Sequence, residues 1–90
     1  MAVDAQTVSR DRVTWLLGCV ENELERALTK FGTFNSQHEG KAVIEEELDE
    51  LWEHVKANTG QGTKAMEEAI QVAAMALRYV HDLAEWGPTS

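Results

Sequence analysis

Carboxylates are concentrated in one short stretch of this 90-residue chain. Six of its sixteen acidic residues are Glu45, Glu46, Glu47, Asp49, Glu50 and Glu53. On a helical wheel, Glu47 and Glu50 lie along one flank of an apolar stripe, with His54 on the same flank. Because residues three apart are neighbours on a helix, these two carboxylates lie within reach of a common cation. The stretch is therefore either a metal site or a solvated acidic helix face.

A second group of possible ligands follows in the next segment. Glu68 and Gln71 are again three apart, and they lead into an apolar face. A short loop joins the two segments, so we expect antiparallel helices that bring Glu68 and Gln71 towards Glu50 and His54. Carboxylate and amide oxygens that converge in this way suit Mg²⁺, which keeps several waters and bridges to substrate phosphates.

Four further residues are candidates for contacts with a negatively charged substrate. They are His38, Lys41, Lys64 and Arg78. The histidine precedes or opens the second helical segment, where it could contact a nucleotide base or phosphate, or instead the N-terminal helix. The three cations could offset the charge of a triphosphate, and each could equally be an ordinary surface cation.

Three amphipathic segments must position these residues. The breaks between them are the glycine-containing stretches 32–40 and 58–62. Apolar residues recur at three-and-four spacing in each segment, which is typical of helices. We expect a single all-α domain over residues 1–90, with N-caps at Asn35 or Ser36 and at Thr63. The expected helices cover about residues 8–31, 36–57 and 63–86.

The third segment is apolar on two sides. Its main stripe runs from Met66 to Ala84, and Val72, Met75 and Tyr79 lie roughly opposite. Two short companion helices can cover only one side. We therefore expect the other side to pack against a second copy, so that homo-oligomerisation completes a helical bundle as a homodimer or homotetramer. The short chain favours the same conclusion, because a small domain buries a modest fraction of its surface.

Composition excludes several classes of protein. The net charge of −8 and the pI near 4.7 argue against a nucleic-acid polymer as partner, because phosphate binding takes clustered Lys and Arg. Cys19 is the only cysteine, which rules out an intrachain disulfide and favours a reducing compartment. The apolar runs are too short for a membrane span, and no secretory signal pattern is present. We expect a cytoplasmic protein without a membrane partner.

Three stretches of the sequence are similar to a known enzyme family. They are FNSQHEG at 34–40, EELDELW at 46–52 and EAIQVAAMA at 68–76. They resemble the MazG-like superfamily of all-α nucleotide pyrophosphohydrolases. The resemblance covers the chain from about Glu23 to about Leu83.

Two motifs mark that family, Glu-Glu-x-x-Glu on one helix and Glu-x-x-Asp on the next. Glu46, Glu47 and Glu50 match the first. Glu68 matches the start of the second, but Gln71 stands where the family usually has aspartate. An amide oxygen can ligate Mg²⁺ but adds no negative charge, so weaker binding or the loss of one metal position is expected.

The resemblance implies a Mg²⁺-dependent enzyme that hydrolyses an NTP or dNTP to the monophosphate and pyrophosphate, a housecleaning activity on the nucleotide pool. Mn²⁺ is an alternative ion. Glu47, Glu50, Glu68 and Gln71 would hold the metal, and Glu46 or Glu47 would take the proton of the attacking water. Two alternatives stay open. One is an enzyme that acts on another nucleotide, such as phosphoribosyl-ATP, and the other is a weakly active or non-catalytic nucleotide-binding or assembly module.

Overall fold

Three helices form the described part of the chain. The computed structural model describes residues 9–57 and 62–84. Its helices are α2 (Arg10–Phe31), α3 (Gln37–Ala57) and α4 (Thr63–Leu83). No strand occurs in the two described ranges, which confirms the all-α prediction. Within these ranges, no helix combines the length and the apolar character that a membrane crossing requires.

The helix ends differ slightly from the predicted ones, for local reasons. α2 begins at Arg10 because Ser9 caps it, its Oγ accepting a hydrogen bond from the Arg12 N–H at 3.2 Å. Ser36 caps α3 in the same way through the Glu39 N–H, at 3.1 Å. The predicted cap at Thr63 is wrong, because Gly62 takes the N-cap position with a left-handed backbone (φ 77°).

The C-terminal end of α4 also falls earlier than expected. α4 ends at Leu83 because Ala84 is extended, with φ −74° and ψ 148°. The predicted continuation through 85–86 lies outside the described residues.

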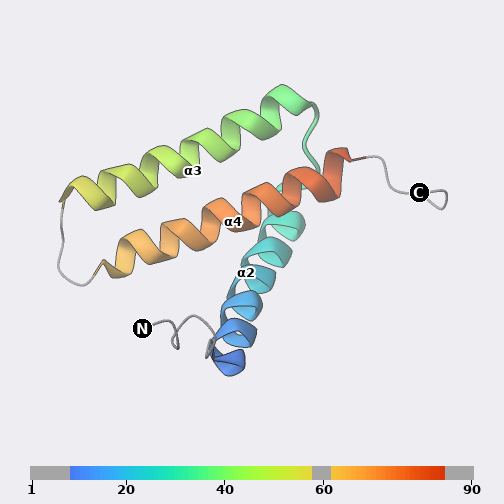
Figure 1. Cartoon of the computed structure of the whole chain (residues 1–90). Helices are drawn as coiled ribbons and strands as arrows, with labels where there is room; N and C mark the ends of the chain where they lie inside the picture. The colour runs from blue at the N-terminus through green and yellow to red at the C-terminus, as the bar shows by residue number, and fades with distance from the viewer. Residues whose placement is uncertain (1–8, 58–61, 85–90) are drawn as a thin grey trace.

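α4 is the central helix of the arrangement. α3 and α4 run antiparallel and side by side, while α2 crosses α4 steeply (Figure 1). Among the described residues, α2 and α3 each pack on α4 but not on one another. The core is small: Ala27 of α2 meets Ala74 and Met75 of α4. Partly buried side chains surround this core, namely Val20, Leu24, Val43 and Ile44. This packing leaves a space between α2 and α3 with α4 as its floor.

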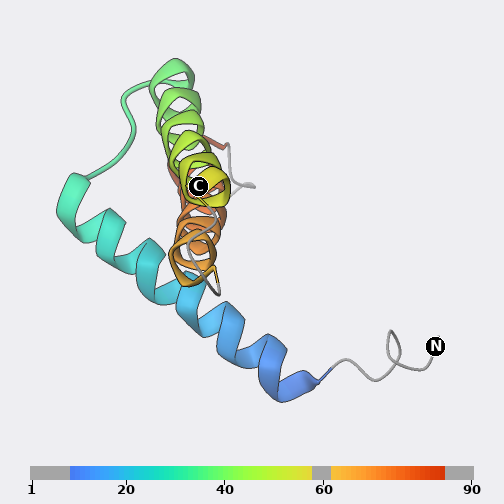
Figure 2. The same ribbon diagram turned by 90° about the vertical axis from the view of Figure 1, so that its left-hand side faces the viewer.

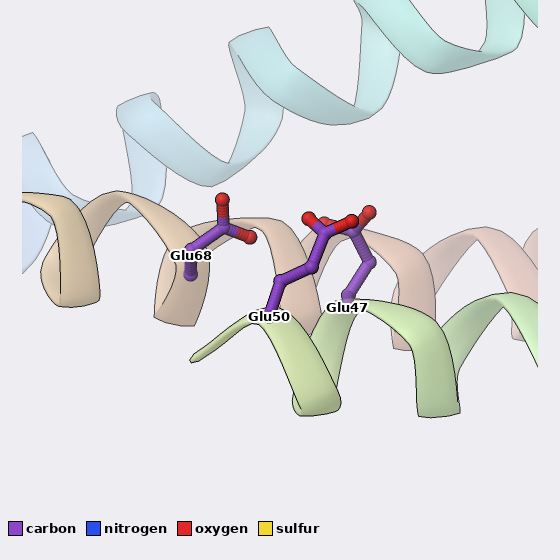
Figure 3. Close-up of side chains that lie close together, drawn as sticks. All are labelled: Glu47, Glu50 and Glu68. Atoms are coloured by element: carbon purple, nitrogen blue, oxygen red, sulfur yellow. The ribbon is translucent and has the colours of Figure 1, made fainter. Parts of the chain in front are cut away.

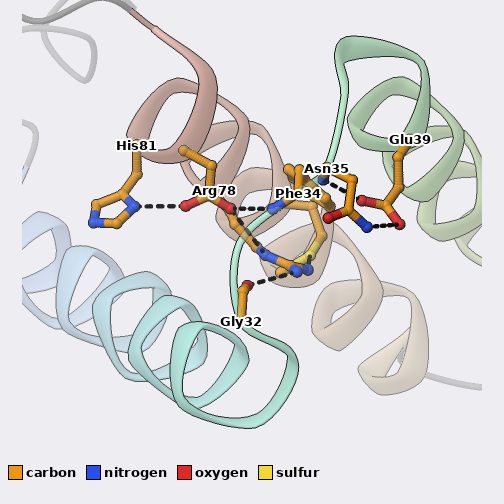
Figure 4. Close-up of polar contacts among 8 residues, drawn as sticks. Gly32, Phe34, Asn35, Glu39, Arg78 and His81 are labelled. Carbon is orange, nitrogen blue, oxygen red and sulfur yellow. Dashed lines mark hydrogen bonds and ion pairs between the residues drawn. The ribbon is translucent and has the colours of Figure 1, made fainter.

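A polar network ties the connection between α2 and α3 to α4 (Figure 4). Arg78 donates from Nη2 to the Gly32 carbonyl at 3.0 Å, and its guanidinium lies 3.9 Å from the centre of the Phe34 ring. Asp82 accepts a hydrogen bond from the Phe34 N–H at 2.9 Å and pairs with Arg78 at 3.6 Å. Gly32 ends α2 at φ 72°, a conformation that favours glycine. Arg78 and Asp82 of α4 thereby hold the connection at two points, Gly32 and Phe34.

Much apolar surface stays exposed within the single chain. No large side chain is fully buried among the described residues, whereas ten large apolar side chains are exposed. On α4 the side carrying Met75 faces the other helices, while Met66 and Leu77 of the main stripe are exposed. On α2 the N-terminal half extends beyond the α3/α4 pair and exposes Trp15 and Leu17 (Figure 2). The three helices therefore leave apolar faces that this chain does not cover itself.

Candidate functional site

Three carboxylates converge between α3 and α4. Glu47 and Glu50 project from α3 and Glu68 from the second turn of α4, and all three point towards α2 (Figure 3). One oxygen from each carboxylate can be chosen so that the three lie within 4.8 Å of one another. The antiparallel pairing of the helices brings Glu68 to the last turns of α3. We call Glu47, Glu50 and Glu68 the acidic triad.

The surroundings of the triad disfavour its full ionisation. Burial, followed by the charges of Glu50 and Glu68, raises the pKa of Glu47 from 4.5 to about 7. Burial and the neighbouring Glu50 also raise the pKa of Glu68, and His54 opposes that shift. Like charges held this close repel unless protons or a cation offset them. A cation bound at the triad would therefore relieve the repulsion among its carboxylates.

Two oxygen atoms of the triad lack hydrogen-bond partners. Glu47 Oε2 and Glu68 Oε2 are buried and have no hydrogen-bond partner within residues 9–57 and 62–84. Buried carboxylate oxygens are normally satisfied, because leaving one unpaired costs about 1–3 kcal/mol or more. The donor set is made of hard oxygen atoms, which is the chemistry that Mg²⁺ and Mn²⁺ require. The triad thus fits a divalent cation in charge, spacing and unsatisfied atoms.

A cavity of about 210 Å³ adjoins the triad in the space between α2 and α3. Glu47 belongs to both the triad and the cavity wall. The polar side chains around the cavity are Glu23, Arg26, Glu46, Glu47, Gln71 and Arg78. The apolar ones are Ala27, Phe31, Val43 and Met75. The cavity therefore offers both charge signs and one exposed aromatic ring next to the carboxylates.

Glu46 and Gln71 lie on the cavity wall. Glu46 is exposed on α3, and Gln71 is half-buried on α4. Both residues border the cavity together with Glu47. Gln71 is therefore placed where its amide can contact a ligand in the cavity.

The four predicted substrate contacts are dispersed. Arg78 lines the cavity, but it is buried and bound to Asp82 and Gly32. Lys41 pairs with Glu45 at 3.0 Å and lines a separate groove between α3 and α4. His38 is exposed in the first turn of α3. Lys64 is exposed on α4, one helical turn before Glu68. Of the four, Arg78 borders the cavity and Lys64 lies near the triad along its helix.

Two charged residues at the cavity are not among the site residues predicted from the sequence. Arg26 and Glu23 face it from α2 and form an ion pair, with Arg26 Nε 3.2 Å from Glu23 Oε2. Their three-residue spacing in the sequence indicates an ion pair on one helix face. It does not indicate a site, because acidic and basic residues spaced in this way are common on exposed helix surfaces.

Comparisons with known proteins identify no relative of this chain. No family model, no curated protein and no solved structure matches this chain. The function is therefore inferred from the site itself and from the resemblance of its motifs.

Proposed function

We propose that this protein is a Mg²⁺-dependent nucleoside triphosphate pyrophosphohydrolase of the MazG-like type, which converts an NTP or dNTP to the monophosphate and pyrophosphate. The observation that carries the proposal is the acidic triad, with two buried oxygens that have no partner. The resemblance of the motifs at 46–50 and 68–71 supports the same reaction. Mn²⁺ would serve as an alternative ion.

Glu47, Glu50 and Glu68 would hold the cation, and Gln71 would add a neutral oxygen from the cavity side. When bound, the ion supplies charge neutralisation for phosphate oxygens and makes water more acidic. The chain contributes position and fixed charge, because α3 and α4 hold the carboxylates in one place before substrate arrives. No covalent intermediate with the protein is required.

A proton acceptor is available beside the triad. Glu46 lies on the cavity wall next to Glu47, is exposed, and is not one of the three converging carboxylates. It is therefore placed to take a proton from the water that attacks a phosphorus atom. Glu47 is the second candidate, because its carboxylate also borders the cavity.

The direct test measures pyrophosphate release from a panel of NTPs, dNTPs and modified nucleotides with Mg²⁺ or Mn²⁺. We expect Glu50→Gln and Glu68→Gln to lower both cation affinity and turnover by at least about tenfold, because each removes a charged ligand. Glu53→Gln is the matched control, since Glu53 is an exposed glutamate of α3 paired with Lys56. Absence of pyrophosphate release from every nucleotide in the wild type would overturn the proposal. Cleavage of phosphoribosyl-ATP alone would favour the related activity.

A second candidate function is a nucleotide-binding or assembly module without strong catalysis. The exposed apolar faces favour it, because such faces mark surfaces that pack against other chains. Gln71→Asp separates the two functions. A rise in cation affinity and turnover indicates an active site limited by a neutral ligand, whereas no cation binding in either form favours the module.

We expect self-association with either function. We propose that a second copy of the chain covers the exposed side of the α3/α4 pair and completes a bundle, as a homodimer or homotetramer. Leu48 and Leu77 are about half exposed on these two helices. Around α3, Leu48 lies about 100° from Glu47 and about 160° from Glu50, and around α4, Leu77 lies about 180° from Glu68. The proposed interface therefore leaves the acidic triad on the other side of the helix pair.

A further inference from the structure

The two guanidinium groups at the cavity have different roles. Arg78 is almost fully buried, and it is bound to the Gly32 carbonyl and to Asp82. Releasing it would undo the connection between α2 and α3. Arg26 is half exposed, and Glu23 is its only hydrogen-bonding partner among the described residues. Arg26 is thus the cavity cation that can exchange its partner without disturbing the fold.

Arg26 lies within electrostatic reach of the acidic triad. Hydrogen bonding to Glu23, followed by the charges of Glu23 and Glu47, raises the pKa of Arg26. The side chain starts from α2 and borders the same cavity as Glu47 on α3. A ligand in this cavity can therefore contact a guanidinium on one side and the triad on the other.

We infer that Arg26 binds a phosphoryl group of the substrate, so that the phosphoanhydride lies across the cavity between this guanidinium and the acidic triad. This inference rests on the proposed function, and it names a substrate-binding residue for that reaction. A planar guanidinium matches the oxygens of a phosphate with two parallel hydrogen bonds. Glu23 engages Nε and Nη2 of the five-donor guanidinium, so the N–H groups on its other edge remain for phosphate oxygens.

The size and charge of the cavity agree with a phosphate-bearing group. Pockets for whole drug-sized ligands measure about 300–1,000 Å³. The cavity of about 210 Å³ therefore suits one portion of a nucleotide, such as two linked phosphates. Three carboxylates and two guanidiniums line it, so an anion is repelled until a cation offsets the carboxylates. Phosphate binding by Arg26 should therefore require a divalent cation.

Glu23 positions Arg26 before the substrate arrives. Its side chain is 18% exposed against 51% for Arg26, so the carboxylate is the more fixed partner. A pre-oriented guanidinium loses less rotational freedom when phosphate binds. Glu23→Gln should weaken pyrophosphate binding, but by less than Arg26→Gln does.

Titration calorimetry with inorganic pyrophosphate, with and without Mg²⁺, tests the inference. We expect Arg26→Gln to weaken Mg²⁺-dependent pyrophosphate binding by about tenfold to hundredfold, with Arg26→Lys in between. Arg12→Gln is the matched control, because Arg12 is exposed near the start of the same helix and does not line the cavity. Binding of Mn²⁺ alone, followed by electron paramagnetic resonance, should not weaken in Arg26→Gln.

The outcomes separate this inference from the proposed function. If Arg26→Gln binds pyrophosphate as the wild type does while the wild type releases pyrophosphate from nucleotides, the inference is wrong and the function stands. If the wild type neither binds a cation nor hydrolyses nucleotides, the proposed function fails. In that case pyrophosphate binding that still depends on Arg26 supports an anion site, and its absence overturns the inference too.

Discussion

The acidic triad makes the stability of the metal-free protein depend on pH. The folded chain keeps the Glu47 proton up to about pH 7, because the pKa is raised to that value from 4.5. Between these values the folded state binds more protons than the unfolded state. The free energy of unfolding therefore falls as pH rises through this window, and Glu68 adds a contribution of the same sign.

Glu47→Gln should remove most of this dependence, because an amide does not titrate. Above pH 7 the variant should be more stable than the metal-free wild type by about 1 kcal/mol, since solvent screens the partly exposed carboxylate and limits the gain. Urea unfolding with a chelator from pH 4.5 to pH 8 measures this. Glu53→Gln should retain the wild-type profile. A wild-type profile that is flat or rises over the window would contradict the assigned pKa.

The pair of Arg78 and Asp82 behaves differently, because both side chains are buried. Removing Arg78 leaves the Asp82 carboxylate with the Phe34 N–H and His81 Nδ1 but without its guanidinium, and breaking a buried ion pair costs about 3–5 kcal/mol. We expect Arg78→Ala to lose about that much stability in urea unfolding. Arg26→Ala should lose much less stability, because its ion pair is exposed.

The double variant Arg78→Met with Asp82→Asn tests the cause of that loss. It removes both charges but keeps an acceptor for the Phe34 N–H, so it should recover at least half of the stability lost in Arg78→Ala. If Arg78→Ala proves no more destabilising than Arg26→Ala, the buried pair is not what holds the connection in place.

The sequence predicted the residues that depend on helical spacing alone. Glu47, Glu50 and Glu68 could be selected because positions three apart share a face and a short loop makes adjacent helices antiparallel. Arg26 could not be assigned to the cavity, because the sequence of α2 does not determine the angle at which this helix crosses α4. Asp82 was missed for a similar reason, because its Phe34 partner is 48 positions away in the chain. Contacts between residues on different helices can be predicted only when the packing of the helices is known, and hydrophobic periodicity does not determine that packing.

Helix packing can be tested at two glycines that both lie inside helices. A Cβ at Gly40 of α3 would lie 2.6 Å from Tyr79 Cδ2 and 3.2 Å from Leu83 Cδ1, so the Tyr79 ring or α4 itself would have to move. At Gly18 of α2 a Cβ would meet no atom within 4 Å. The first glycine permits the close approach of α3 to α4, whereas the second has no such role within one chain.

Alanine at the two positions should have opposite effects. Gly18→Ala should stabilise the protein by about 0.5–1 kcal/mol, because alanine is the better helix former. Gly40→Ala should destabilise it by about 1–3 kcal/mol, because overpacking outweighs that gain. Thermal unfolding of both variants measures the difference. Stabilisation by both substitutions would mean that α3 and α4 tolerate a wider separation than the structure has.

Helix existence was predictable at the scale of elements, but the role of each face of α4 was not. Both sides of α4 are apolar, so periodicity could not decide which side meets the other helices. The structure assigns the inner side to Ala74 and Met75, and it leaves Met66 and Leu77 exposed. The deciding factor is the crossing of α2, which packs beside Ala74 and leaves the opposite side open.

The whole molecule has too small a core for its apolar content. Its core side chains are mostly small, while three leucines and two tryptophans are among those exposed on α2 and α3. Water contact with this much apolar surface is unfavourable, at roughly 25 cal/mol per Å². Association of two copies through the α3/α4 pair would remove a large part of it. It would also leave each acidic triad facing its own α2.

Analytical ultracentrifugation at micromolar concentration tests this association. We expect the wild type to sediment as a dimer or tetramer, and Leu77→Asp to shift it towards the monomer, because a charge in an apolar interface loses its hydration without gaining a partner. Ala42→Asp is the matched control. Ala42 is exposed on α3 and lies about 120° around that helix from Leu48, so the new charge should stay in solvent. A wild type that remains a stable monomer at this concentration would show that one chain tolerates its exposed apolar faces, and the bundle would then consist of three helices.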